Sequence, residues 1–198
     1  MSLFQVRVHG RGGQGVVTAA ELLSVAAFSE GRFAQAFPSF GSERTGAPVV
    51  AFCRIADHEI RVREPITSPD ALIIQDPTLL HQVDVFSGLQ TDGYLLINSS
   101  KGLVELGLEE LLASFRPEHL LHVPATEIAR ETVGRPIANA VLLGGFAALT
   151  GVISLDAVVA AIRDRFSGAL AEGNAAGAQR AYEYVRDHMG VAAGAQAG

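Results

Sequence analysis

Short apolar runs recur along the first two thirds of the chain, and each ends at a glycine or a polar residue. Runs of this length that are rich in β-branched and aliphatic residues predict strands. The predicted strands cover residues 3–9, 32–37, 49–55, 59–62, 71–75, 94–98 and 120–123. The run at 71–75 is strongly apolar, as is typical of a strand buried in a parallel sheet. The strands at 49–55 and 59–62 flank a tight turn at Ala56 and Asp57, so we expect an antiparallel hairpin there.

Apolar residues at helical spacing mark the segments between and after these strands. Val16, Ala19, Leu23 and Ala27 share one face of a helix that is expected to stop near Gly31. Further helices are predicted at 77–85, 107–114, 138–149, 155–166 and 178–189. The pattern predicts an α/β fold: a mostly parallel sheet with flanking helices, a short antiparallel hairpin and an α-rich C-terminal third. Residues 1–190 are expected to form one domain, and the Ala/Gly-rich residues 191–198 a flexible tail.

Composition narrows the class of protein. The 198 residues are 48% hydrophobic and 18% charged, enough for one substantial core. The formal net charge of −6, with no basic run, argues against nucleic acid as a main partner. No secretory signal is visible at the N-terminus, and no apolar run reaches the roughly 18 residues that a membrane span needs. We therefore expect a cytoplasmic protein with no membrane partner.

Metal and nucleophile chemistry find little support in the sequence. The single cysteine, Cys53, excludes an internal disulfide and an iron–sulfur cluster that this chain alone would ligate by thiolates. Because Cys53 lies in a predicted apolar strand, we interpret it as a small buried hydrophobe. The six histidines are scattered, so no metal site and no catalytic residue are predicted. His9, at the end of the first strand, is expected to form a structural hydrogen bond; donation to a bound anion is the alternative.

A glycine loop joins the first predicted strand to the first predicted helix. Its residues are Gly10, Arg11, Gly12, Gly13, Gln14 and Gly15. Glycines here permit a tight turn and let backbone amides approach a phosphate at a helix N-terminus, and an arginine favours anions further. A dinucleotide site also needs an acidic residue at the end of the second strand, where Phe37 and Pro38 stand instead. Classical NAD binding is therefore disfavoured, and two hypotheses remain: a different phosphate-bearing ligand, or a turn that only packs a helix on a strand.

Residues 38–48 form a second loop that is too long for a simple connection. It places Glu43 beside Arg44 between two glycines, so Arg44 could bind a phosphate or carboxylate, or pair with an acidic group in the loop or at a subunit interface. Asn98 ends a predicted strand and Asn139 begins a predicted helix. Both could line the ligand crevice at the carboxyl ends of the strands. Helix capping is the alternative, and we favour it slightly for Asn139.

Both loops carry a family resemblance. The segments HGRGGQGVVTAAELL and AQAFPSFGSERTGAPVVAFCRI closely resemble the gamma subunit, or fused gamma domain, of pyruvate-type 2-oxoacid:ferredoxin oxidoreductases. The resemblance continues in DALIIQDPTLL, GLQTDGYLLINSS, ANAVLLGGFAALTGVISLDAVVAAI and EGNAAGAQRAYEYV. It covers residues 4–185, nearly the whole chain.

The resemblance implies a subunit of a complex that decarboxylates a 2-oxoacid oxidatively to an acyl-CoA. Alpha and beta subunits would hold thiamine diphosphate and Mg, and a delta-type subunit the iron–sulfur clusters that pass electrons to ferredoxin or another acceptor. The gamma part is expected to be Rossmann-like and to share a coenzyme A site formed by the glycine loop, Glu43, Arg44, Asn98 and Asn139. The chain itself lacks a Gly-Asp-Gly thiamine motif. A self-contained nucleotide-binding oxidoreductase and a purely structural interaction subunit remain the alternatives.

Overall fold

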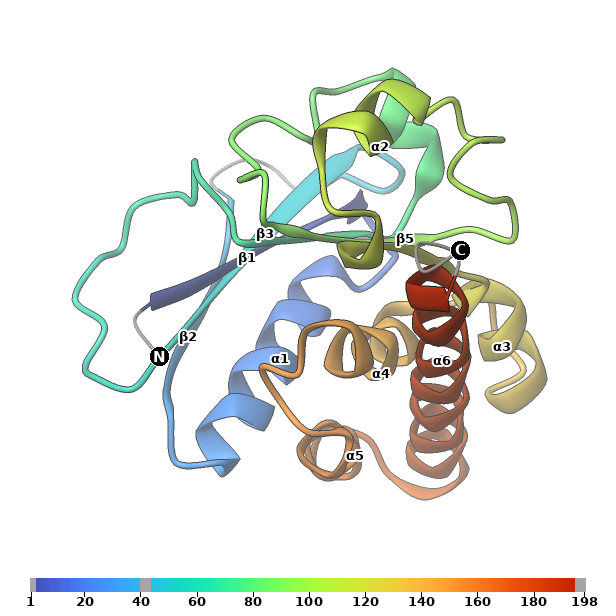
Figure 1. Ribbon diagram of the computed structural model, residues 1–198. Helices are drawn as coiled ribbons and strands as arrows, with labels where there is room; N and C mark the ends of the chain where they lie inside the picture. The colour runs from blue at the N-terminus through green and yellow to red at the C-terminus, as the bar shows by residue number, and fades with distance from the viewer. Residues whose placement is uncertain (1–2, 40–43, 195–198) are drawn as a thin grey trace.

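The computed structural model describes residues 3–39 and 44–194, which form a single sheet with helices on one face and mostly loops on the other (Figure 1). The strands are β1 (Leu3–Arg11), β2 (Phe33–Pro38), β3 (Pro48–Ala56), β4 (Ala71–Ile74), β5 (Tyr94–Asn98) and β6 (Leu120–Val123). The helices are α1 (Val16–Ser29), α2 (Glu109–Ser114), α3 (Ala125–Thr132), α4 (Asn139–Thr150), α5 (Leu155–Arg165) and α6 (Gly168–Gly194), with 3-10 turns η1 (Pro77–His81) and η2 (Pro117–His119).

The six-stranded sheet has the order β2-β3-β1-β4-β5-β6. Strands β1, β4, β5 and β6 run parallel, whereas β3 is antiparallel to both β1 and β2. From β1 the chain continues to one side through α1 and β2, while β4 leads to the other side through β5 and β6. The strand order therefore reverses between β1 and β4, and in open α/β sheets ligands bind at the carboxyl ends of the strands around such a point.

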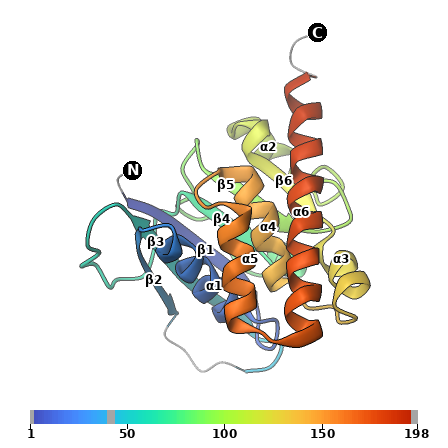
Figure 2. The ribbon, with the colours of Figure 1, turned by 90° about the horizontal axis from the view of Figure 1, so that it is seen from below.

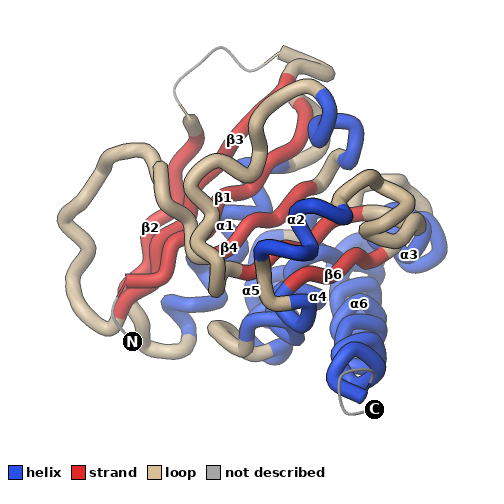
Figure 3. Tube along the Cα trace, turned by 45° about the horizontal axis from the view of Figure 1, so that its top comes forward, coloured by secondary structure: helices blue, strands red, loops and turns tan. Residues whose placement is uncertain are grey.

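The two faces of the sheet are covered differently. Helices α1, α4 and α6 pack on one face, with α3 and α5 around them (Figure 2), over alternate strand residues such as Val6, Val8 and Ile73. The other face carries a smaller apolar cluster under η1 and α2 that includes Leu72, Ile74 and Leu95. The tube view shows this loop-rich face, with α2 lying across the strands (Figure 3).

Buried arginines hold the loops over the β1–β3 part of that face. Arg54 is 2% exposed and donates to the carbonyl oxygens of Val62 at 3.5 Å and Glu64 at 2.5 Å. Arg7 is 8% exposed and donates to the carbonyl oxygens of Val85 and Ser87, both at 2.8 Å. Irregular loops contain backbone carbonyls without strand or helix partners, and the two guanidinium groups satisfy some of them.

The predicted fold class is confirmed, with corrections to individual elements. The antiparallel pairing exists, but the predicted strand at 59–62 is wrong, because that segment is loop held by Arg54 and β3 pairs instead with β1 and β2. The helix predicted at 77–85 ends after one 3-10 turn at His81. The sequence did not predict α3, whose buried residues are few: Ala125, Ile128 and Ala129.

Helix α6 is longer than its apolar pattern predicted. It begins at Gly168 rather than near 178, because the glycines of its first half contribute to close packing instead of ending the helix. A Cβ at Gly173 would lie 2.5 Å from the carbonyl oxygen of Thr132, and one at Gly177 would lie 2.7 Å from a methyl group of Val141. At the other end the helix continues to Gly194, so residues 191–194 of the expected tail are helical. Residues 195–198 lie outside the described part.

Candidate functional site

The glycine loop turns the chain from β1 into α1 at the carboxyl edge of the sheet. Gly13 and Gly15 have φ values of 92° and 70°, a region that side chains other than glycine rarely adopt. Gly12 has a different reason to be glycine, because a Cβ there would overlap the backbone carbonyl of Arg44. Gly12 therefore allows the second loop to pack against the glycine loop, and the choice between the two hypotheses for this loop stays open. Gly13, in contrast, meets nothing within 4 Å and faces open space.

The second loop docks directly on the glycine loop. The amide of Gly12 donates to the carbonyl of Ala47 at 2.9 Å, and the amide of Gly46 donates back to the carbonyl of Gly12 at 3.0 Å. The Arg44 side chain is exposed. Glu43 lies outside the described residues, so its predicted role stays a prediction. The two motifs that carry the family resemblance therefore form one structural unit.

Arg11 ties this unit to the segment after β4. Its guanidinium group contacts the Asp76 carboxylate at 3.2 Å and donates to Thr78 Oγ1 at 2.8 Å, Gln82 Oε1 at 2.7 Å and the Gly46 carbonyl at 3.0 Å. Arg11 therefore joins the glycine loop to the second loop and to η1.

Gln14 and Asp76 extend the same network. Gln14 accepts from the Arg11 amide at 2.8 Å and donates to Asp76 Oδ2 at 2.8 Å. Burial opposes ionisation of Asp76, but hydrogen bonds from Thr78 and Gln14 and the charge of Arg11 outweigh it and lower the pKa of the carboxyl group. The carboxylate therefore remains ionised and fixes the first turn of η1, which it also caps through the Thr78 amide.

The two asparagines lie at the same edge. Asn98 bridges β5 to α3: it donates to the Gln75 carbonyl at 2.9 Å and accepts from the Thr126 amide at 3.1 Å. The slightly favoured capping role of Asn139 is wrong: Ala138 occupies the N-cap position of α4, and the Asn139 side chain donates to the Gly15 carbonyl at 3.2 Å. It thus links the start of α4 to the glycine loop, a long-range contact that local sequence cannot indicate.

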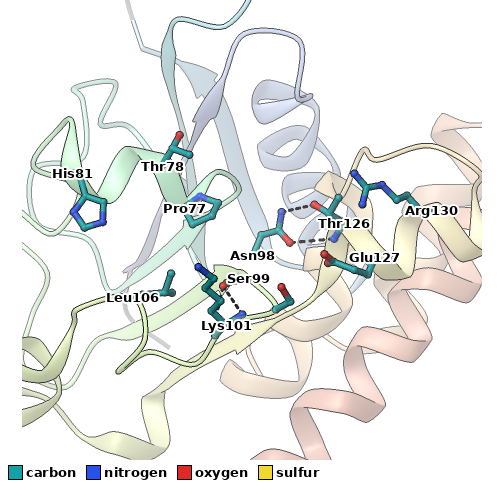
Figure 4. A pocket seen from close by; sticks show the side chains of 11 residues that line it. Pro77, Thr78, His81, Asn98, Ser99, Lys101, Leu106, Thr126, Glu127 and Arg130 are labelled. Carbon is teal, nitrogen blue, oxygen red and sulfur yellow. Dashed lines mark hydrogen bonds between the residues drawn. The ribbon is translucent and has the colours of Figure 1, made fainter.

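Three adjoining cavities follow this carboxyl edge. The first, of about 410 Å³, has Pro77, Asn98, Lys101 and Arg130 among its lining residues (Figure 4). The second, of about 40 Å³, shares Asn98 and Thr126 with the first and Ile137 and Asn139 with the third. The third, of about 240 Å³, opens at the glycine loop. The shared residues place the three cavities next to one another along the ends of β1, β4 and β5, and we call this row of cavities the track.

The third cavity combines a helix N-terminus with two arginines. Its lining includes Gly13, Gly15 and Thr18 around the start of α1, Arg135 and Arg165, and an apolar wall formed by Val133, Ile137, Phe166 and Leu170. Helix α1 has no side-chain N-cap and no acidic residue in its first turn. The first amides of a helix have no intrahelical partner and carry a partial positive charge, so an anion can occupy this position.

The first cavity is more open and more mixed in charge. Figure 4 shows Lys101, Glu127 and Arg130 around it, with Asn98 bonded to Thr126 and Ser99 bonded to Lys101. Ser99 Oγ accepts from the Lys101 amide at 2.9 Å, which fixes the turn after β5. This cavity can hold a polar group of a ligand that reaches along the edge.

The small middle cavity is bounded by four carboxamide side chains: Gln14, Gln75, Asn98 and Asn139. Gln75 is 4% exposed, and neither its amide nitrogen nor its amide oxygen finds a partner within the described residues. A buried polar group without a partner costs about 1–3 kcal/mol. Sequence reasoning missed Gln75, although its place at the end of a buried strand beside Asp76 was a usable signal.

Arg135 and Arg165 were also missed, and no local pattern could have found them, because they approach the glycine loop from two different C-terminal segments. His9, in contrast, makes the structural hydrogen bond that we expect for it: it is 5% exposed and accepts from Arg7 Nε at 3.1 Å. Cys53 is fully buried, as predicted, and burial raises the pKa of its thiol. Within residues 3–39 and 44–194 there is no cluster of three or more metal-ligating side chains, and no helix there is long and apolar enough to cross a membrane.

Comparison with known proteins identifies relatives along nearly the whole chain. The sequence model of the pyruvate ferredoxin/flavodoxin oxidoreductase family matches residues 5–184. The common gamma subunit of the pyruvate/ketoisovalerate oxidoreductases of Pyrococcus abyssi is 49% identical over 181 residues, which cover 91% of this chain and 96% of that protein.

Solved structures agree with this. Pyruvate oxidoreductase subunit PORC from Thermotoga maritima is 33% identical with a TM-score of 0.77, covering 92% of this chain and 97% of that one. A 2-oxoglutarate:ferredoxin oxidoreductase from Magnetococcus marinus, solved with 2-oxoglutarate, coenzyme A and succinyl-CoA bound, is 16% identical with a TM-score of 0.72. The likeness covers 95% of this chain and 32% of that longer one, and at this identity it shows a shared fold.

Proposed function

Because the chain belongs to the pyruvate ferredoxin/flavodoxin oxidoreductase family, and within it resembles the gamma-type subunits, we propose that it helps its complex bind coenzyme A. It is a subunit of an oxidoreductase and works with partner subunits. In the proposal, alpha-, beta- and delta-type partners hold thiamine diphosphate, Mg and the iron–sulfur clusters, which supply decarboxylation and electron transfer to ferredoxin or another acceptor. The residues of this chain bind and orient the acyl acceptor.

One observation carries the coenzyme A part of the proposal: the uncapped N-terminus of α1 and two arginines line the same cavity. Coenzyme A is a polyanion with a long, thin, uncharged arm. Its diphosphate would accept hydrogen bonds from the first amides of α1 and pair with Arg135 and Arg165, while the arm follows the track toward the end of β5. A coenzyme A complex of a structurally similar oxidoreductase is consistent with this assignment.

The role in the complex is tested by recovering the chain from its native cell extract and identifying what accompanies it. We expect larger chains that carry thiamine diphosphate and iron–sulfur clusters, together with dye reduction that depends on both a 2-oxoacid and coenzyme A. The acid that supports reduction identifies the substrate. Recovery of the chain alone with its own bound nucleotide would instead support a self-contained oxidoreductase.

The coenzyme A site is tested in the assembled complex with Arg135→Gln and Arg165→Gln. Each substitution removes one charged partner of the diphosphate, so we expect the KM for coenzyme A to rise roughly tenfold while the KM for the 2-oxoacid stays the same. The matched control is Arg186→Gln, an exposed arginine of α6 that lines none of the three cavities. If neither arginine variant changes the KM for coenzyme A, the subunit has only a structural role at this cavity.

A further inference from the structure

Gln75 is held in a place where its side chain lacks partners. It follows the last residue of β4, and its backbone is fixed on both sides: the amide donates to the His9 carbonyl at 2.8 Å, and the carbonyl accepts from Asn98 at 2.9 Å. Its carboxamide is buried, and both polar atoms are without a hydrogen bond in the described part of the chain. In native structures such a group is nearly always paired with protein, an ordered water or a bound ligand.

Two of the neighbouring carboxamides, those of Gln14 and Asn98, already make other hydrogen bonds. Gln14 uses its oxygen for the Arg11 amide and its nitrogen for Asp76. Asn98 uses its nitrogen for Gln75 O and Thr126 Oγ1 and its oxygen for the Thr126 amide. Gly10 packs against this carboxamide, since a Cβ there would lie only 3.1 Å from Gln75 Oε1. The donor and the acceptor of Gln75 are therefore both uncommitted among the described residues.

The cavity that Gln75 lines is the narrow part of the track. Its volume of about 40 Å³ compares with about 240 Å³ and 410 Å³ for the cavities on either side. A space of this size admits a thin chain or a few waters, whereas a purine ring needs the wider cavities. A ligand that spans the track must pass an uncharged, slender segment beside Gln75.

We propose that Gln75 is a specificity-determining residue that recognises a secondary amide of the bound ligand, donating to its carbonyl and accepting from its N–H. This inference rests on the proposed function, because the arm of coenzyme A is a slender chain that carries such amides. The edge of adenine also offers a neighbouring donor and acceptor, and the test separates the two sources.

The test uses Gln75→Met, which keeps the length of the side chain and removes both polar atoms. Affinities of the full-length chain, wild type and variant, are measured by calorimetry for coenzyme A, for phosphopantetheine, which lacks the nucleotide, and for 3′-phosphoadenosine 5′-diphosphate, which lacks the arm. We expect the variant to bind coenzyme A and phosphopantetheine about tenfold more weakly and the nucleotide unchanged. We also expect its denaturation midpoint to rise, because an unsatisfied buried amide has been replaced by an apolar group.

Gln35→Met is the matched control. Gln35 also has a buried amide oxygen without a partner in the described residues, but it lies on β2 and lines none of the three cavities. Its substitution should change stability alone. Unchanged coenzyme A binding by Gln75→Met would overturn the inference, and a loss confined to the nucleotide would assign Gln75 to adenine instead. The proposed function is tested separately by the wild-type protein. If wild type binds no coenzyme A, either as the isolated chain or in its complex, the proposed function is wrong whatever the variants do.

Discussion

The two faces of the sheet are built on different principles. On the helix face, small residues allow backbones to approach closely: Gly144 of α4 lies against the backbone of Ala178 in α6, where a Cβ would overlap the carbonyl oxygen. On the β1–β3 part of the loop face, long charged side chains instead bridge a gap between the sheet and irregular segments. Arg54, for example, hydrogen-bonds the loop after β3. The helix face therefore depends on small side chains, and the loop face depends on long ones.

Because of this difference, the two faces are destabilised by different kinds of substitution. Close helix packing tolerates almost no added volume, because interiors are already dense and backbone atoms cannot move aside cheaply. A loop held by a buried guanidinium tolerates changes of its own side chains but not the loss of the arginine, which leaves several carbonyls unpaired. The three cavities of the track lie at the carboxyl edge of the sheet, between these two faces.

The largest effect is expected from Gly144→Ala. The new methyl group overlaps the Ala178 carbonyl, so the helices must separate, and we expect a loss of about 4 kcal/mol in the free energy of unfolding, measured by denaturant titration. Gly145→Ala is the matched control: its Cβ would lie 3.3 Å from side-chain atoms of Leu96 and Val185, which can adjust, and alanine favours a helix. We expect its stability to stay within about 1 kcal/mol of wild type. Equal losses in the two variants would refute close approach as the cause.

The loop face is tested by Arg54→Met. Methionine fills the space but leaves the carbonyls of Val62 and Glu64 without their donor, so we expect a loss of about 3 kcal/mol in unfolding free energy. Arg61→Met, on the same loop, removes an exposed ion pair with Glu59 and should cost under about 0.5 kcal/mol. Hydrogen exchange should show faster exchange of residues 57–66 in the first variant only. A stable Arg54→Met with unchanged exchange would show that the loop holds itself.

The smallest effect is a pH dependence from His9. Burial, and then the charge of Arg7, lower the pKa of the imidazole from 6.5 to about 3 in the folded chain. Below pH 6.5 the unfolded chain therefore binds a proton that the folded chain takes up only near pH 3, and stability falls as the pH is lowered through this window. Between pH 7 and pH 5 the expected loss is about 2 kcal/mol. His9→Gln keeps an acceptor for Arg7 but does not titrate, so its pH curve should be flatter by that amount; parallel curves for the two proteins would contradict the assignment.

The fold class could be predicted from the sequence because the spacing of apolar residues and the length of each apolar run are local features of the chain. The apolar runs of β1, β4, β5 and β6 and the apolar periodicities of α1, α4 and α5 all appear as predicted, to within one or two residues at most ends. The errors at 59–62 and in α6 arise because tertiary contacts override the local pattern. Residues 59–62 alternate like a strand, but Arg54 bonds the Val62 carbonyl and the segment is a loop. The glycines of α6 resemble helix breakers, but they allow α3 and α4 to pack closely against the helix.

The features of the candidate site likewise fall into those that the sequence predicts and those that depend on the tertiary structure. The sequence alone determined the glycine loop, the second loop, Asn98 at a strand end and Asn139 at a helix start, because glycine conformation and element ends are properties of neighbouring residues. Only the tertiary structure decided that Arg11 clamps the two loops together, that Asn139 binds the Gly15 carbonyl, and that Arg135, Arg165 and Gln75 face one track. These relations join residues up to 124 positions apart, and which of them meet is set by how the helices pack on the sheet.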